Sequence, residues 1–169
     1  MRTKANVLLR LNLLFLSCFL LLFGCGRKSV YSGDILEELM ASCGSLPRGE
    51  IYCSDAEEGG AGYAPSALLR AMYGEEGEEA IRFCEFSLYV SSFAQPYEIA
   101  VLAAPSSDHA RRVYALCLSR LDDLKVALRN TDYEGLSQNA LVYRRGRYVV
   151  MGLTQDRDSF LHAVKRALG

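Results

Sequence analysis

Residues 97–129, YEIAVLAAPSSDHARRVYALCLSRLDDLKVALR, decide the fold class of this chain. Tyr97 to Ala103 form a short apolar run with the length and composition of a buried strand. Pro105 and Ser106 then end the strand and offer an N-cap, and Asp108 lies in the first turn, where a helix dipole favours an anion. The apolar residues after this cap recur at spacings of three and four and form one stripe: Ala110, Val113, Tyr114, Cys117, Leu121, Leu124 and Leu128. Because such a helix needs a sheet to cover, the stretch predicts a strand and a helix of one packed domain.

The segments on either side supply further strands. Residues 81–90 alternate between two sets of side chains, and a short connection lets this strand pair with the next one as a hairpin. After the long helix, residues 130–138 are interpreted as a loop. Residues 140–144 and 147–153 then predict a second hairpin around Arg145-Gly146.

A final helix follows the second hairpin. Asp156 or Asp158 caps it, and its apolar stripe is Phe160, Leu161, Val164 and Leu168. The order strand, strand, helix therefore occurs twice. It predicts an α+β fold with a four-stranded, mainly antiparallel sheet and two helices on one face. Short helices predicted at residues 34–43 and 66–73 remain to cover the other face, unless a partner covers it.

The alternation along the strands also predicts which side chains each face carries. The face under the two long helices is expected to hold Cys84, Phe86, Leu88, Val90, Ile99 and Val101. The opposite face is expected to hold Phe83, Tyr89, Leu141, Tyr143, Tyr148 and Val150. An apolar face of this kind is either covered or used as an interface. Since tyrosine combines an apolar ring with a hydroxyl, we predict a groove at the edge of the N-terminal helices, with Tyr143, Tyr148 and Tyr89 as the candidate binding surface.

Composition limits the function classes. The chain has 169 residues, of which 50% are hydrophobic and 23% charged, which is typical of one folded domain. Its net charge is −1, and loss of residues 1–24 would remove three basic residues and take the net charge to −4. A mildly acidic domain is not typical of nucleic-acid binding, so no nucleic acid is expected as a partner.

The N-terminus reads as an export signal. Three basic residues (Arg2, Lys4 and Arg10) precede an apolar run of about thirteen residues, about 20 Å of helix, which is short of the roughly 30 Å of a hydrocarbon core. The run ends in Leu22-Phe23-Gly24-Cys25, which resembles a bacterial lipobox, with a small residue before the cysteine that receives diacylglycerol. The alternative is an uncleaved anchor with an incidental cysteine.

These features predict a domain organisation and a location. Residues 1–24 are a cleaved lipoprotein signal peptide, 25–33 a lipidated tether that begins at Cys25, and 34–169 a single α+β domain. Two acyl chains anchor a protein stably, whereas a single chain binds only marginally. We therefore expect attachment to the outer face of the cell membrane through the N-terminal lipid.

The whole pattern resembles a family of small lipoproteins from Gram-positive, clostridial-type bacteria that carry a domain of unknown function. The matching pieces are Leu22 to Cys25, Leu46-Pro47, Met72-Tyr73-Gly74, Tyr97 to Val101, Asp108 to Leu128 and Ala140 to Leu168. The chain departs from that pattern in a glycine-rich insert at residues 59–62 and in its extra cysteines. The resemblance implies an extracytoplasmic lipoprotein and implies no activity.

Residues capable of catalysis are scattered. His109 and His162 lack neighbouring ligand motifs and are interpreted as surface residues, and Cys84 and Cys117 as buried apolar residues. The acidic run at residues 75–79 is interpreted as a solvated turn, because calcium-ligand spacing is missing. No metal, cofactor or catalytic residue is predicted.

Two further features leave alternatives open. The segment Arg144-Arg145-Gly146-Arg147 is either a solvated hairpin tip or a contact for lipid phosphates or anionic wall polymers. Cys43 and Cys53 are a candidate disulfide that would close a short loop, and would stabilise the domain by roughly 2–3 kcal/mol.

The sequence favours one function class over two others. An anchor, a compact domain and the lack of a catalytic motif favour a binding or accessory module of the cell envelope, whose partner is an envelope protein or a small ligand. A small enzyme acting on envelope material is the first alternative. A small solute-binding component is the second, although about 145 mature residues are few for two lobes around a ligand.

Overall fold

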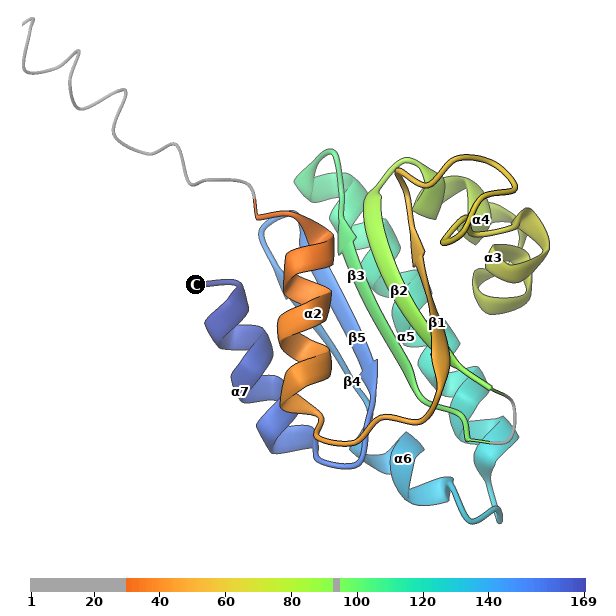
Figure 1. Cartoon of the computed structure of the whole chain (residues 1–169), viewed down its shortest axis with the longest axis vertical. Coiled ribbons are helices and arrows are strands. Elements are labelled where there is room, and N and C mark those ends of the chain that lie inside the picture. Colours follow the sequence, from red (N-terminus) through yellow and green to blue (C-terminus); the bar gives the residue numbers. More distant parts are fainter. Residues whose placement is uncertain (1–29, 93–94) are drawn as a thin grey trace, which may run out of the picture.

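Five antiparallel strands form the sheet, and β3 lies at its centre (Figure 1). The computed structural model describes residues 30–92 and 95–169. The strands are β1 (Gly49–Cys53), β2 (Glu85–Ser91), β3 (Glu98–Ala103), β4 (Leu141–Arg145) and β5 (Tyr148–Leu153). They are ordered β1-β2-β3-β5-β4 across the sheet. The predicted α+β class, the two hairpins and the antiparallel sheet are confirmed.

The predicted number of four strands is wrong, because β1 adds a fifth strand at one edge. It pairs with β2 from Gly49 opposite Ser91 to Cys53 opposite Ser87. Every residue of β1 is exposed or half-buried, and Ile51 keeps 46% of its surface exposed. Such an edge strand buries too little apolar surface to produce an alternating pattern in the sequence.

Six helices lie in the described part of the chain. They are α2 (Ser32–Ser42), α3 (Ser66–Tyr73), α4 (Glu75–Arg82), α5 (Ser107–Leu128), α6 (Glu134–Asn139) and α7 (Arg157–Ala167). The predicted caps are confirmed for both long helices. The Ser106 hydroxyl accepts from the backbone N–H of His109 at 3.1 Å, and the Asp156 carboxylate accepts from the first turn of α7. Within the described residues, no helix combines the length and the apolar character that crossing a membrane requires.

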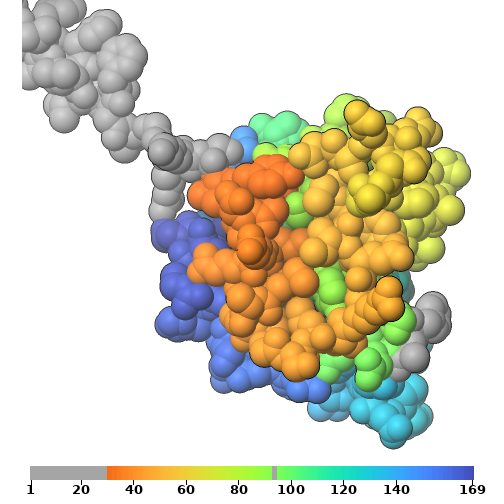
Figure 2. All heavy atoms as spheres, in the orientation of Figure 1, coloured from red at the N-terminus to blue at the C-terminus, as the bar shows by residue number. Residues whose placement is uncertain are grey.

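The helices cover both faces of the sheet, so the prediction that α5 and α7 share one face is wrong. In Figure 1, α2 and α7 pack together on one face, while α5 covers the other face with α3 and α4. Figure 2 shows the α2 side, where atoms of α2 and of the chain after it hide most of the sheet. The strands before α5 and α7 are antiparallel neighbours, so the two helices start at opposite ends of the sheet. Both faces of these strands are apolar, and the sequence pattern therefore does not predict which face of the sheet each helix covers.

The side chains of β3 also face differently from the prediction. Ala100 lies opposite Leu88, and Leu102 lies opposite Phe86, so these residues share the α5 face. Ile99 and Val101 point to the α2 side instead, where they join the cluster that contains Tyr89. The error arises because every residue of β3 is buried, and Ile99 to Ala103 are apolar on both faces of the strand.

Two predicted loops contain helices. The acidic run at residues 75–79 is not a solvated turn, because it forms the start of α4, and Glu78 is only 8% exposed. The predicted loop at residues 130–138 contains most of α6. The helix α2 begins at Ser32, so the last two residues of the predicted tether belong to the folded domain.

Candidate functional site

The three tyrosines predicted as a binding surface lie on the α2 side of the sheet, and only two of them reach the surface. Tyr89 is 2% exposed and donates its hydroxyl hydrogen to the carbonyl of Pro47, so its place in the predicted surface is wrong. Its ring is covered by the chain that links α2 to β1, a segment without a strong apolar pattern. Tyr143 and Tyr148 are half-buried at the edge of the α2–α7 cluster. They remain the accessible part of the predicted surface.

Tyr148 ties the second hairpin to the point where the chain enters the domain. Its hydroxyl donates to the carbonyl of Val30 at 2.9 Å, across 118 positions of sequence. The guanidinium of Arg147 lies over the Tyr148 ring, 5.5 Å from its centroid. We call the end formed by Val30, Tyr31 and residues 144–148 the entry end.

The hairpin tip at the entry end is a tight turn. Gly146, with φ +58°, is the first of two residues that connect β4 to β5, a position where the tighter hairpin turns favour glycine. The carbonyl of Arg147 accepts from the backbone N–H of Ala104 at 2.9 Å, which fixes the tip against the loop after β3. Arg144 is exposed and Arg145 half-buried, so basic side chains project from a rigid support.

The start of α2 is held from several sides. The backbone N–H of Ser32 donates to Glu85 at 2.7 Å, and its hydroxyl lies 3.0 Å from the hydroxyl of Ser87. Tyr31 donates to Asp55 at 2.9 Å, and this hydrogen bond is the main cause that raises the pKa of Tyr31 to about 12. The entry end is therefore pre-organised by contacts to β2, β5 and the loop after β1.

The predicted disulfide between Cys43 and Cys53 is not formed, and the geometry is incompatible with it. Ser87 lies beside the start of α2 and donates to the sulfur of Cys53 at 3.8 Å. Cys43 is the C-cap of α2, whose 11 residues span about 16 Å. A disulfide needs Cα atoms about 4.4–6.8 Å apart, so α2 separates the two thiols. All four cysteines in the described residues are free.

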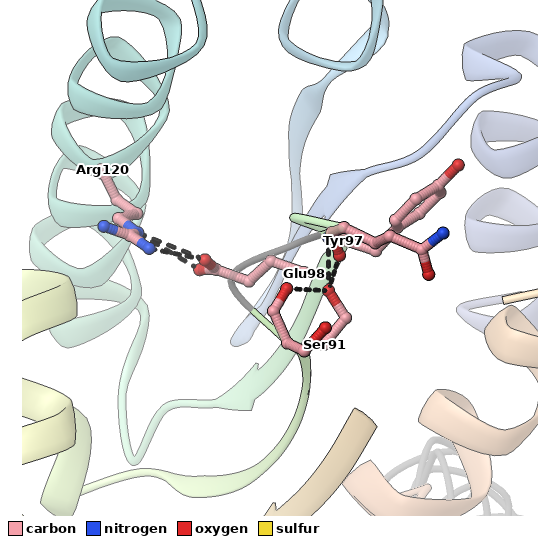
Figure 3. Close-up of polar contacts among 6 residues, drawn as sticks. Ser91, Tyr97, Glu98 and Arg120 are labelled. Atoms are coloured by element: carbon pink, nitrogen blue, oxygen red, sulfur yellow. Dashed lines mark hydrogen bonds and ion pairs between the residues drawn. The ribbon is translucent and has the colours of Figure 1, made fainter. Parts of the chain in front are cut away.

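A buried ion pair connects the central strand to the long helix. Figure 3 shows Glu98 and Arg120 pointing toward each other, while Tyr97 leaves the other side of β3. The guanidinium donates to Glu98 at 2.9 and 3.3 Å, and the Glu98 side chain is only 5% exposed. Burial raises the pKa of Glu98, and Arg120 partly opposes this shift by favouring the charged form.

The surroundings of this pair are closed. The hydroxyl of Tyr73 is buried without a hydrogen-bond partner among the described residues, and burial raises the pKa of Tyr73 well above its ordinary value. Cys117 is fully buried, and desolvation also raises its thiol pKa. Because a substrate cannot reach these groups, we interpret the Glu98–Arg120 pair as part of the fold. The sequence showed Glu98 within an apolar strand, but its partner lies 22 positions away on another element.

A surface hollow of about 350 Å³ lies beside α4 and is lined by Glu78, Glu79, Arg82 and Phe83. Glu78 pairs with Arg70 at 2.5 Å and with Arg82 at 3.1 Å. Hydrogen bonds from Ser66, Arg70 and Arg82 lower the pKa of Glu78 to about 2. This carboxylate therefore stays ionised and engaged, which makes it unsuited to proton transfer near neutral pH.

Of the remaining candidate residues, Cys84 and His109 meet at the carbonyl of Ala80, to which the Cys84 thiol donates at 3.6 Å. His109 is half-buried, with its Nε2 atom 2.7 Å from the carbonyl of Ala80, and His162 is exposed. Cys84 is buried as predicted, and burial raises the pKa of its thiol to about 12. Across residues 30–92 and 95–169, no cluster of three His, Cys, Asp or Glu side chains has metal-binding geometry. The predicted lipidation site, Cys25, lies outside the described residues.

Comparison with known proteins assigns neither a family nor a function to the chain. No protein-family model, curated protein or solved structure matches the chain.

Proposed function

We propose that this chain is a lipid-anchored, extracytoplasmic protein that presents its α+β domain at the membrane surface as a binding or accessory module of the cell envelope. The observation that carries the proposal is the sequence Leu22-Phe23-Gly24-Cys25 at the end of a short apolar run with a basic start. We also propose that the chain belongs with the small Gram-positive lipoproteins that it resembles.

The arrangement of the domain supports this proposal in two ways. The chain enters beside a hairpin that carries Tyr143, Tyr148 and three arginines, so a short tether would hold these side chains near the membrane. Tyrosine and arginine are, together with tryptophan, enriched among the residues that carry most of the binding energy at protein interfaces. We propose the exposed side of Tyr143 as part of the surface that a membrane partner contacts.

Metabolic labelling with palmitate tests the anchor. Wild type and Cys18→Ala should both incorporate label, because Cys18 lies inside the apolar run that the signal peptidase removes. Cys25→Ala should incorporate none and should keep the mass of the uncleaved precursor. Label in Cys25→Ala, or a labelled wild type with an uncleaved N-terminus, would overturn the proposal.

Crosslinking in intact cells followed by affinity capture tests the binding role. One envelope component should be enriched with wild type and lost with Tyr143→Ser. The matched control is Tyr133→Ser, which removes another half-buried tyrosine near α6. The binding role is wrong if both variants capture the same material as wild type, or if wild type captures nothing above background.

A further inference from the structure

We propose that the entry end docks on the anionic phospholipid surface that holds the anchor, with Arg144 and Arg145 contacting headgroup phosphates. This inference rests on the proposed lipid anchor and adds a defined orientation of the domain on the membrane.

The β4–β5 hairpin lies close to the part of the chain that follows the lipidated cysteine. Tyr148 binds the carbonyl of Val30 at 2.9 Å, so the β4–β5 hairpin lies directly beside the chain entry. Cys25 precedes Val30 by five residues, and a fully extended chain covers at most about 3.6 Å per residue. Val30 is therefore held within about 18 Å of the lipidated cysteine, whatever path the tether takes, and the Tyr148 hydroxyl of the hairpin adjoins Val30.

The hairpin carries a local positive charge. Residues 140–148 contain three arginines and no acidic residue. A guanidinium binds phosphate oxygens in a bidentate geometry and is weakly hydrated, so arginine suits a phosphate-rich surface. The Tyr148 ring supports Arg147, while Arg144 is exposed on the other side of the strand. The hairpin therefore presents basic groups to both sides of its tip.

Acidic side chains near the entry end are partly engaged by the protein. Asp55 accepts from the hydroxyl of Tyr31, and Glu85 accepts from the backbone N–H of Ser32. Asp34 is exposed in the first turn of α2. Repulsion from Asp34 would tilt the domain so that the hairpin, and not α2, approaches an anionic surface.

Exposed apolar surface lies next to the hairpin. Val30 and Tyr31 each keep 38% of their surface exposed, at the point where the chain enters the domain. Tyrosine favours the headgroup level of a bilayer, where its ring is partly buried and its polar tip stays hydrated. An apolar pair beside basic side chains matches an anionic lipid interface better than a polymer in bulk water.

The test uses the purified, lipidated full chain in two kinds of vesicle, one of phosphatidylcholine alone and one of phosphatidylcholine mixed equally with phosphatidylglycerol. An arginine-selective dicarbonyl reagent is applied, and peptide mass spectrometry gives the modification rate of each arginine. Each arginine near an anionic membrane contributes about fivefold to association. We expect the rates at Arg144 and Arg145 to fall about fivefold with phosphatidylglycerol.

Arg129 and Arg157 are internal controls in the same sample. Both are exposed, Arg129 follows the far end of the 22-residue α5, and Arg157 opens α7 after β5 has crossed the sheet. Their rates should be equal in the two vesicles. Equal rates at Arg144 and Arg145 in the two vesicles would overturn docking through charge on anionic phospholipid. Protection that appears only after addition of wall polymer would assign the site to that polymer.

Two double variants distinguish loss of charge at the hairpin from loss of the same charge elsewhere on the domain. In Arg144→Gln/Arg145→Gln, the rate at Arg147 should become the same in both vesicles. In Arg129→Gln/Arg157→Gln, which removes the same charge, Arg147 should stay protected by phosphatidylglycerol. Loss of protection in both variants would contradict the proposal. The intact mass of the sample reports diacylglycerol at Cys25 separately, so a missing lipid overturns the anchor while the vesicle comparison still reports on docking.

Discussion

Glu98 and Arg120 place a carboxylate and a guanidinium between β3 and α5, with the Glu98 side chain 5% and the Arg120 side chain 20% exposed. Two opposed effects act on Glu98: burial favours the neutral acid, and the guanidinium favours the carboxylate. Burial is the larger cause, so the pKa of Glu98 is raised from its ordinary value of 4.5. The fold therefore tolerates this charge mainly through one partner.

Arg120→Met should destabilise the domain by about 3–5 kcal/mol at pH 7, because it leaves a buried carboxylate unpaired. An acid whose folded-state pKa is raised stabilises the fold below its unfolded pKa, and this contribution is lost as the pH rises through the folded pKa. The deficit should therefore shrink as the pH falls from 7 toward about 4.5. Urea unfolding followed by circular dichroism at several pH values measures it.

Glu98→Gln/Arg120→Met is the matched control for that experiment. It removes the buried charge, so most of the lost stability should return at pH 7 and the pH dependence should disappear. A deficit in Arg120→Met that is the same at pH 5 and pH 7 would show that lost packing, and not the unpaired charge, causes it.

Some residue-level features were accessible from the sequence. Cys84 and Cys117 lie on apolar stripes, and both are buried as predicted. The Glu98–Arg120 pair was not accessible, because its members belong to different elements and sequence periodicity only reports neighbours on one element. The burial of Tyr89 has the same origin, since the covering segment around Pro47 carries no periodic signal.

At the scale of elements, α7 approaches the sheet at Gly152. A methyl group at this position would overlap the ring of Phe160, which is 1% exposed. Glycine in β5 therefore lets the aromatic ring lie directly on the strand backbone. This contact sets the distance between α7 and the sheet.

Gly152→Ala should destabilise the domain by about 1–3 kcal/mol, because Phe160 has to move within a packed core. Gly135→Ala is the control, since nothing lies within 4 Å of the added carbon and alanine favours the helix. Adding Phe160→Leu to Gly152→Ala should recover part of the loss. Thermal unfolding of the four proteins measures these changes, and a Gly152→Ala variant as stable as wild type would refute the packing argument.

The hairpins and the long helices were predictable because each shows a strong local pattern or a capping residue, such as Ser106 and Asp156. The strand β1 was not, since its exposed edge position demands few apolar side chains. The face of each helix was not predictable either. Residues 99–102 are all apolar, so either face of β3 can pack against a helix.

At the scale of the whole molecule, helices on both faces divide the apolar residues into two clusters that share one sheet. The cluster under α2 and α7 includes Ile99 and Val150, and the cluster under the first half of α5 includes Leu88 and Met151. The second half of α5 adds Leu121, Leu124 and Leu128 to the cluster of α2 and α7, so this helix joins the two clusters. Neither cluster can lose its cover without exposing strands that the other one needs. The domain should therefore unfold as one unit.

Thiol reactivity tests this cooperativity. Cys43 and Cys53 are half-buried and should react with a maleimide in the native state. Cys84 and Cys117 are buried, with thiol pKa values raised by desolvation, and should react only through unfolding. In increasing urea, their reactivity should rise together with the loss of circular dichroism. Both thiols lie in the cluster under α5, so exposure of both before the loss of circular dichroism would mean that this side of the sheet opens independently.

The hydrogen bond between Tyr148 and Val30 has a mechanical consequence. The axis of α2 runs from the chain entry toward the opposite end of the domain, and Ile35, Leu36 and Leu39 bury its inner side along that length (Figure 1). A pull on the tether in the direction of this axis would shear all of these contacts at once instead of peeling them one by one. The Tyr148 bond carries the load first and links it to the sheet. A domain suspended in this way would yield abruptly under tension, while a slack tether would leave it undisturbed.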